Sequence, residues 1–71
     1  MIQESYDQFV DRLLVKTGRG PEATIPILQG IQQEFRYLPG AALQRVSQVT
    51  DISLAQLVGV ATFYHQFRHR P

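Results

Sequence analysis

The sequence predicts a small all-α protein, a four-helix bundle whose second half resembles a helix-turn-helix. Apolar residues recur at intervals of three and four, and no segment alternates apolar and polar residues as a strand would. Glycine and proline residues divide the chain into four such segments. Because 71 residues are enough for one small core and too few for two, we expect residues 1–71 to form a single helical domain.

The first expected helix runs from about Gln3 to Lys16. Its apolar side chains fall on one face at helical spacing, and its charged side chains fall on the other. We expect it to end at Gly18, because glycine readily adopts the left-handed conformation that follows many helices. The inner face is expected to comprise Tyr6, Phe9, Val10, Leu13 and Leu14.

The second expected helix ends near Phe35, and its start has two interpretations. Pro21 suits a first helical turn, where the missing N–H has no partner to lose. A start at Pro21 places Pro26 beyond the first turn, where it should kink the helix. In the alternative, Thr24 is the N-cap and Pro26 lies in the first turn. We favour the earlier start, with an inner face of Leu28, Ile31 and Phe35 together with Ile25 or Ile27.

Two further helices are expected in the second half of the chain. Pro39 opens the first of them, which runs to about Val49. Ser53 is expected to cap the last helix, and Gln56 three residues later completes a capping box, in which each side chain bonds the other residue's backbone N–H. The inward-facing residues of the third helix are expected to be Leu43, Val46 and Val49.

The last helix is unusually apolar for so small a protein. On a helical wheel its apolar side chains span about 220°, whereas an ordinary surface helix has a stripe of about 100°. We expect its Leu57 side to face the core and at least one of Phe63 and Phe67 to be exposed to a partner. The core stripe is expected to comprise Leu54, Leu57, Val58, Ala61 and Tyr64, and the adjoining stripe Val60, Phe63 and Phe67.

Composition excludes several classes of function. The formal net charge of +1 gives no strong attraction for nucleic acid. No apolar run approaches about 18 residues, so we expect no membrane insertion. The N-terminal residues are polar and acidic, unlike a secretory signal peptide. Together with the absence of cysteine, they favour a cytoplasmic protein.

Three segments resemble one redox family, in the same order along the chain. Residues 59–68, GVATFYHQFR, are similar to the end of its helical N-terminal domain. Residues 25–35 resemble the second helix of that domain, and residues 37–43 resemble the following turn and third helix. The family is the thioredoxin-like 2Fe–2S subunit of complex I and of NAD-linked hydrogenases and formate dehydrogenases. Within this family the sequence resembles the diaphorase subunit of bidirectional hydrogenases.

The resemblance implies a place in the electron-transfer module of an NADH dehydrogenase, hydrogenase or formate dehydrogenase. There the chain would contact the flavin- and NAD-binding subunit, or a separate or truncated 2Fe–2S domain. The family's next domain binds its cluster through four cysteines, and this sequence has none. We therefore expect a non-catalytic docking or assembly domain without cofactor or metal, and we expect Pro71 to lie near the linker to the cluster domain.

The candidate partner interface lies at the end of the last helix. Aromatic residues are enriched in the buried centres of interfaces. Arg68 and Arg70 form a basic tail, suited to an acidic partner or to solvent near a helix C-terminus. We expect His65 to be packed or partner-facing, because stable metal sites usually need three or more ligands. The candidate interface comprises Val60, Phe63, Phe67, Arg68 and Arg70.

Two alternatives remain open. One is a DNA-binding helix-turn-helix protein, because residues 41–63 are expected to form a helix, a short turn and a capped helix. The first side chains of a recognition helix meet base edges, but here they include one amide and no cation before Arg68. The other alternative is a stand-alone adaptor without a redox partner.

Overall fold

The computed structural model describes residues 5–64 and residue 67. These residues contain four α-helices, one short 3-10 helix and no β-strand, which confirms the predicted all-α class. The elements are α1 (Tyr6–Thr17), η1 (Pro21–Ala23), α2 (Thr24–Phe35), α3 (Gly40–Val49) and α4 (Leu54–Phe63).

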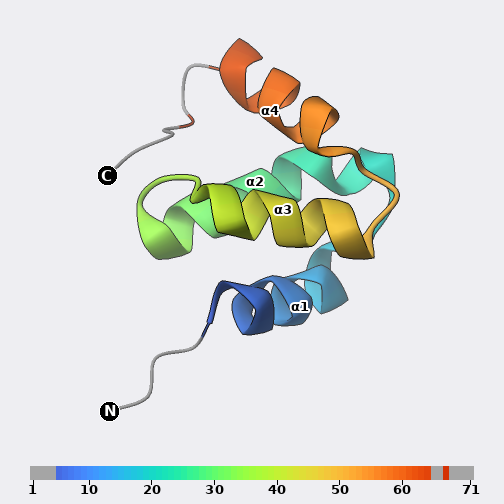
Figure 1. Cartoon of the computed structure of the whole chain (residues 1–71), viewed down its shortest axis with the longest axis vertical. Coiled ribbons are helices and arrows are strands. Elements are labelled where there is room, and N and C mark those ends of the chain that lie inside the picture. Colours follow the sequence, from blue (N-terminus) through green and yellow to red (C-terminus); the bar gives the residue numbers. More distant parts are fainter. Residues whose placement is uncertain (1–4, 65–66, 68–71) are drawn as a thin grey trace.

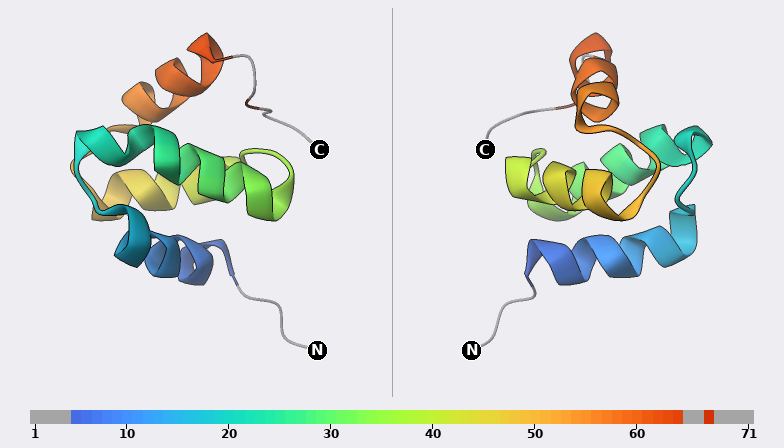
Figure 2. Two further views of the ribbon diagram at one scale, coloured as in Figure 1. Left: turned by 180° about the vertical axis from the view of Figure 1, so that it is seen from behind. Right: turned by 45° about the vertical axis from the view of Figure 1, so that its right-hand side comes forward.

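The helices are arranged with α2 and α3 in the middle and the two outer helices on opposite sides (Figures 1 and 2). Helix α1 packs on both α2 and α3, and α4 packs on both from the other side. Each outer helix therefore has one face against the middle pair. The opposite face of each outer helix is covered by no other helix of the described chain.

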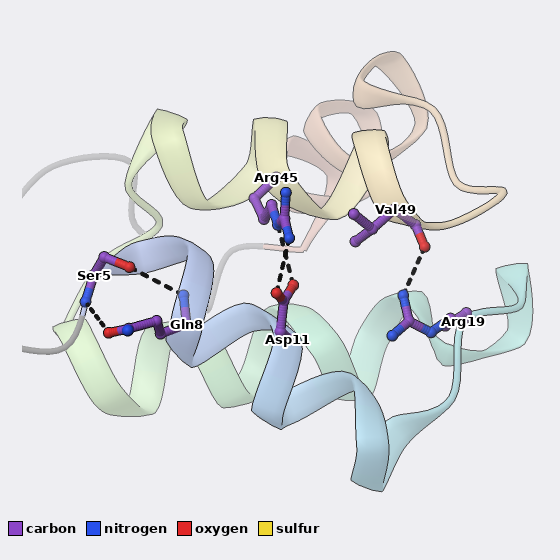
Figure 3. Close-up of polar contacts among 6 residues, drawn as sticks. All are labelled: Ser5, Gln8, Asp11, Arg19, Arg45 and Val49. Carbon is purple, nitrogen blue, oxygen red and sulfur yellow. Dashed lines mark hydrogen bonds and ion pairs between the residues drawn. The ribbon is translucent and has the colours of Figure 1, made fainter.

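Helix α1 begins at Tyr6, later than the expected Gln3. Ser5 is its N-cap, and the Ser5 hydroxyl accepts a hydrogen bond of 3.1 Å from the Gln8 backbone N–H. The Gln8 side-chain carbonyl accepts one of 3.2 Å from the Ser5 N–H, which completes a capping box (Figure 3). As predicted, Gly18 ends the helix, with a φ of 86°.

The start of α2 differs from the favoured prediction. Residues Pro21–Ala23 form a 3-10 turn, and the α-helix begins only at Thr24, with Ala23 as its N-cap. Pro26 is therefore in the first helical turn, where a backbone N–H would have no intrahelical acceptor. Pro26 therefore does not have to kink α2, because the chain changes from a 3-10 helix to an α-helix before this proline. The Thr24 hydroxyl donates a 2.7 Å hydrogen bond to the Pro21 carbonyl and so closes this turn.

The four helices share one hydrophobic core. The predicted inner faces of α1, α2 and α3 are largely confirmed, with Ile27 rather than Ile25 fully buried on α2. The connections contribute as well, since Leu38 and Ile52 are buried beside the helices. The buried apolar residues are Phe9, Val10, Leu14, Ala23, Ile27, Leu28, Ile31, Leu38, Ala42, Leu43, Val46, Ile52, Leu57, Ala61 and Phe67.

Polar contacts tie α1 to α3 on the side away from α4. The Arg45 guanidinium donates two hydrogen bonds, of 3.0 and 2.8 Å, to the Asp11 carboxylate (Figure 3). The hydrogen bond from Arg45 lowers the pKa of Asp11 below its usual range. Arg19, just after α1, donates a 2.8 Å hydrogen bond to the carbonyl of Val49 at the end of α3. These contacts fix α1 against α3 at two points along their length.

Candidate partner surface on helix α4

Helix α4 begins at a well-defined cap. The Ser53 hydroxyl accepts a 3.0 Å hydrogen bond from the Gln56 N–H, as predicted. The Gln56 side chain does not complete the expected box; its amide group donates a 3.4 Å hydrogen bond to the Thr24 hydroxyl. This contact joins the start of α4 to the start of α2. It helps to set which side of α4 faces the core.

Only a narrow side of α4 is buried. Leu57 and Ala61 are buried and Val60 is partly buried against the core, which confirms the predicted Leu57 side. Val58, predicted to be a core residue, is 41% exposed. Leu54 and Tyr64, grouped with Leu57 on the helical wheel, are exposed too. The wheel was wrong for these residues because α4 lies across α2 and α3 and meets them along a stripe narrower than its apolar arc.

Helix α4 ends at Phe63, earlier than the wheel assumed. Tyr64 has extended backbone angles, φ −98° and ψ 117°. The chain therefore leaves the helix, and the Phe67 side chain is only 7% exposed, within the core. The structure thus corrects the placement of Phe67 on one exposed stripe with Phe63. Val60 is partly covered as well, so among the described residues of the predicted interface Phe63 is the one that is largely exposed.

Phe63 is 78% exposed, which confirms that one of the two phenylalanines faces solvent. Its ring lies 5.5 Å from that of Tyr64 in an edge-to-face contact. The Tyr64 ring in turn lies 6.5 Å from that of Phe67, again edge to face. Edge-to-face pairs at such distances are favourable. The exposed Phe63 ring therefore contacts Tyr64, and Tyr64 in turn contacts Phe67 of the core.

The solvent side of α4 carries no charge. We define the outer face of α4 as five of its seven exposed residues, Ala55, Val58, Gly59, Thr62 and Phe63; the other two, Leu54 and Gln56, lie in its first turn. Every charged residue of the described chain lies before residue 52. A Cβ atom at Gly59 would meet no atom within 4 Å, so the backbone is open at the centre of this face. The lack of charge on α4 is visible in the sequence, but the exposure of Val58 is not.

The residues present do not fit a 2Fe–2S cluster. The 71-residue sequence contains no cysteine, and thiolates are the usual ligands of such clusters. Within residues 5–64 and 67, no group of three or more histidine, cysteine, aspartate or glutamate side chains could hold a metal ion. Arg68, Arg70 and His65 lie outside the described residues, and their expected roles stay predictions.

None of the helices in the described part of the chain has both the length and the apolar character needed to span a bilayer. The longest, α1 and α2, have 12 residues each, whereas a span needs about 20.

The sequence matches a known protein family over most of its length. The family model for thioredoxin-like [2Fe-2S] ferredoxin matches residues 10–71, which include all of α2, α3 and α4 and most of α1. The matched region therefore contains the core, the aromatic series from Phe63 to Phe67 and the outer face of α4. The chain belongs to the thioredoxin-like [2Fe-2S] ferredoxin family.

Proposed function

We propose that this chain is a non-catalytic helical docking domain in an electron-transfer module. The module is that of an NADH dehydrogenase, an NAD-reducing hydrogenase or a formate dehydrogenase. The partner is its flavin- and NAD-binding subunit. Family membership supports the electron-transfer setting. The observation that carries the docking role is the 78% exposure of Phe63 on a helix whose solvent side is uncharged.

The outer face of α4 has the chemistry of a binding surface. A surface helix normally places charged or strongly polar residues towards water. Here the outer face of α4 offers an aromatic ring, small residues and Val58. Aromatic anchors supply much contact area and lose little conformational freedom on binding. The contact of Phe63 with Tyr64 restricts the ring further, which lowers the entropic cost of docking.

The chemistry of the cluster ligands indicates which part of the module this chain supplies. A cluster of the family type needs thiolate ligands, and these 71 residues supply none. The cluster ligands therefore belong to another polypeptide segment, a separate or truncated 2Fe–2S domain in this proposal. The helical chain contributes apolar contact area and position to the assembly.

Binding to the flavin- and NAD-binding subunit of the same organism tests the proposal. The chain is titrated into that subunit by isothermal calorimetry, alongside Phe63→Ala and Val15→Ala. Val15 is the matched control, because it is an apolar side chain, 82% exposed, on α1 at the other end of the molecule (Figure 1). We expect Phe63→Ala to weaken binding about tenfold or more, as for a central aromatic anchor. Unchanged affinity for Phe63→Ala, or no binding by the unmodified chain, would contradict the proposal.

A further inference from the structure

We infer that the outer face of α4 pairs with the same face of a second copy of this chain. The pairing is antiparallel and two-fold symmetric, with the two Gly59 residues facing each other. This inference does not rest on the redox partner proposed above. It rests on the spacing of residues along α4, on the charge of this face and on its size.

The spacing makes the face complementary to itself. Gly59 lies in the middle of α4, and nothing lies within 4 Å of the place where a Cβ would stand. Ala55 precedes it by four residues and Phe63 follows it by four, so all three lie on one side of the helix. When two such helices run antiparallel with their Gly59 residues opposed, Phe63 of each copy lies opposite Ala55 of the other. A large exposed ring then meets a small side chain twice.

The charge distribution also suits a second copy. In a two-fold pair of identical faces, a charged residue near the symmetry axis lies close to the same residue of the other copy. Such like-charged pairs at an interface weaken association. From residue 52 to residue 64 the chain has no charged side chain. The charged residues of the described chain lie before α4, and the Arg45–Asp11 ion pair is between α1 and α3. Pairing of two outer faces therefore brings no like-charged side chains of the described residues together.

The size of the face sets the strength of the pairing. Helix α4 has 10 residues and is therefore about 15 Å long, with a width of about 10 Å. Such a pair buries a few hundred Å² per copy, below the roughly 800 Å² per partner of stable complexes. We therefore expect a weak, reversible dimer at high concentration. Because Phe63 is central to both interfaces, a docking subunit and a second copy compete for the same face.

Sedimentation equilibrium of the purified chain tests the inference. The weight-average mass should rise from 8.1 kDa towards twice that value as the concentration approaches about 1 mM, the range expected for so small an interface. Gly59→Lys and Gly59→Glu should each stay at the mass of one chain, because each places two like charges at the two-fold axis. An equimolar mixture of the two should associate again, since the axis then brings opposite charges together. Val15→Lys, the control on α1, should associate like the unmodified chain.

The Gly59 variants should fold, because the site is open and both new residues favour a helix more than glycine does. Far-ultraviolet circular dichroism verifies this. A constant mass of one chain, association of the single Gly59 variants, or a mixture that stays monomeric would each overturn the inference. None of these results bears on binding to the flavin-containing subunit, which is measured separately, so the two proposals fail independently.

Discussion

Shortening Leu57 to alanine should destabilise the protein far more than shortening its neighbour Val58. Both residues are apolar, both lie in the middle of α4, and the helical wheel placed both in the core. The structure separates them, since Leu57 has 0% exposure and Val58 has 41%. The two substitutions therefore test directly which side of α4 packs on the core.

The expected magnitudes follow from burial. Leu57→Ala removes a fully buried side chain and leaves a cavity, which costs about 2–5 kcal/mol of the free energy of unfolding. Val58→Ala removes groups that are partly solvated and leave no closed cavity, so we expect about 0.5 kcal/mol or less, as for other surface substitutions. A core of this size usually supplies only about 3–5 kcal/mol in total. Leu57→Ala should therefore bring the protein close to unfolding at 25 °C, whereas Val58→Ala should not.

Urea denaturation followed by circular dichroism at 222 nm measures the difference. The midpoint for Val58→Ala should lie close to that of the unmodified protein, and the midpoint for Leu57→Ala should fall to low urea concentration. Equal losses for the two variants, or a larger loss for Val58→Ala, would show that α4 is rotated relative to the described arrangement.

Three further outcomes are expected. Arg36 ends α2 with a φ of 72°, a backbone angle that favours glycine. Arg36→Gly should therefore raise the free energy of unfolding, measured in urea melts, by up to about 1 kcal/mol. A lower free energy of unfolding for this variant would refute the prediction. Asp11 has a lowered pKa in the fold, chiefly through the hydrogen bond from Arg45, so its stabilising effect should be present above its usual pKa of 3.8 and be lost as the pH falls through the lower folded value. Melts of the unmodified chain and Asp11→Asn should therefore converge in acid, and a constant gap would contradict the assignment. Because α4 offers no cation to phosphate, fluorescence anisotropy should detect no sequence-specific DNA binding at physiological salt, whereas a specific complex would restore the helix-turn-helix alternative.

Local signals in the sequence predicted the helices well because caps and breakers act on their immediate neighbours. As expected, Gly18 marks the C-terminal end of α1 and Ser53 marks the start of α4. The later start of α1 could also have been found, since Ser5 and Gln8 have the spacing of a capping box. The division of residues 21–35 into a 3-10 turn and an α-helix was harder to predict, because Pro21 and Pro26 each suit a first turn.

The candidate interface could be predicted only in part. Periodicity identifies which residues of α4 are apolar, but the neighbouring helices decide how wide a stripe they cover, and that depends on packing between distant segments. Val58 was therefore assigned to the wrong side. Phe67 was misplaced for another reason, since no glycine or proline between α4 and Phe67 signals that the helix ends at Phe63. The exposure of at least one of Phe63 and Phe67 was predicted because a helix this apolar cannot bury all of its sides in so small a protein; which of the two it would be was not.

Chemical-shift mapping tests the docking surface most directly. The ¹⁵N-labelled chain is titrated with the unlabelled flavin- and NAD-binding subunit, and the backbone amide signals are followed. The account predicts that the largest shifts and line broadening occur at Ala55, Gly59 and Phe63 on the outer face of α4. Signals around Val15 on α1 should change least. Perturbations centred on α1, with α4 unaffected, would contradict the claim that the protein docks through α4.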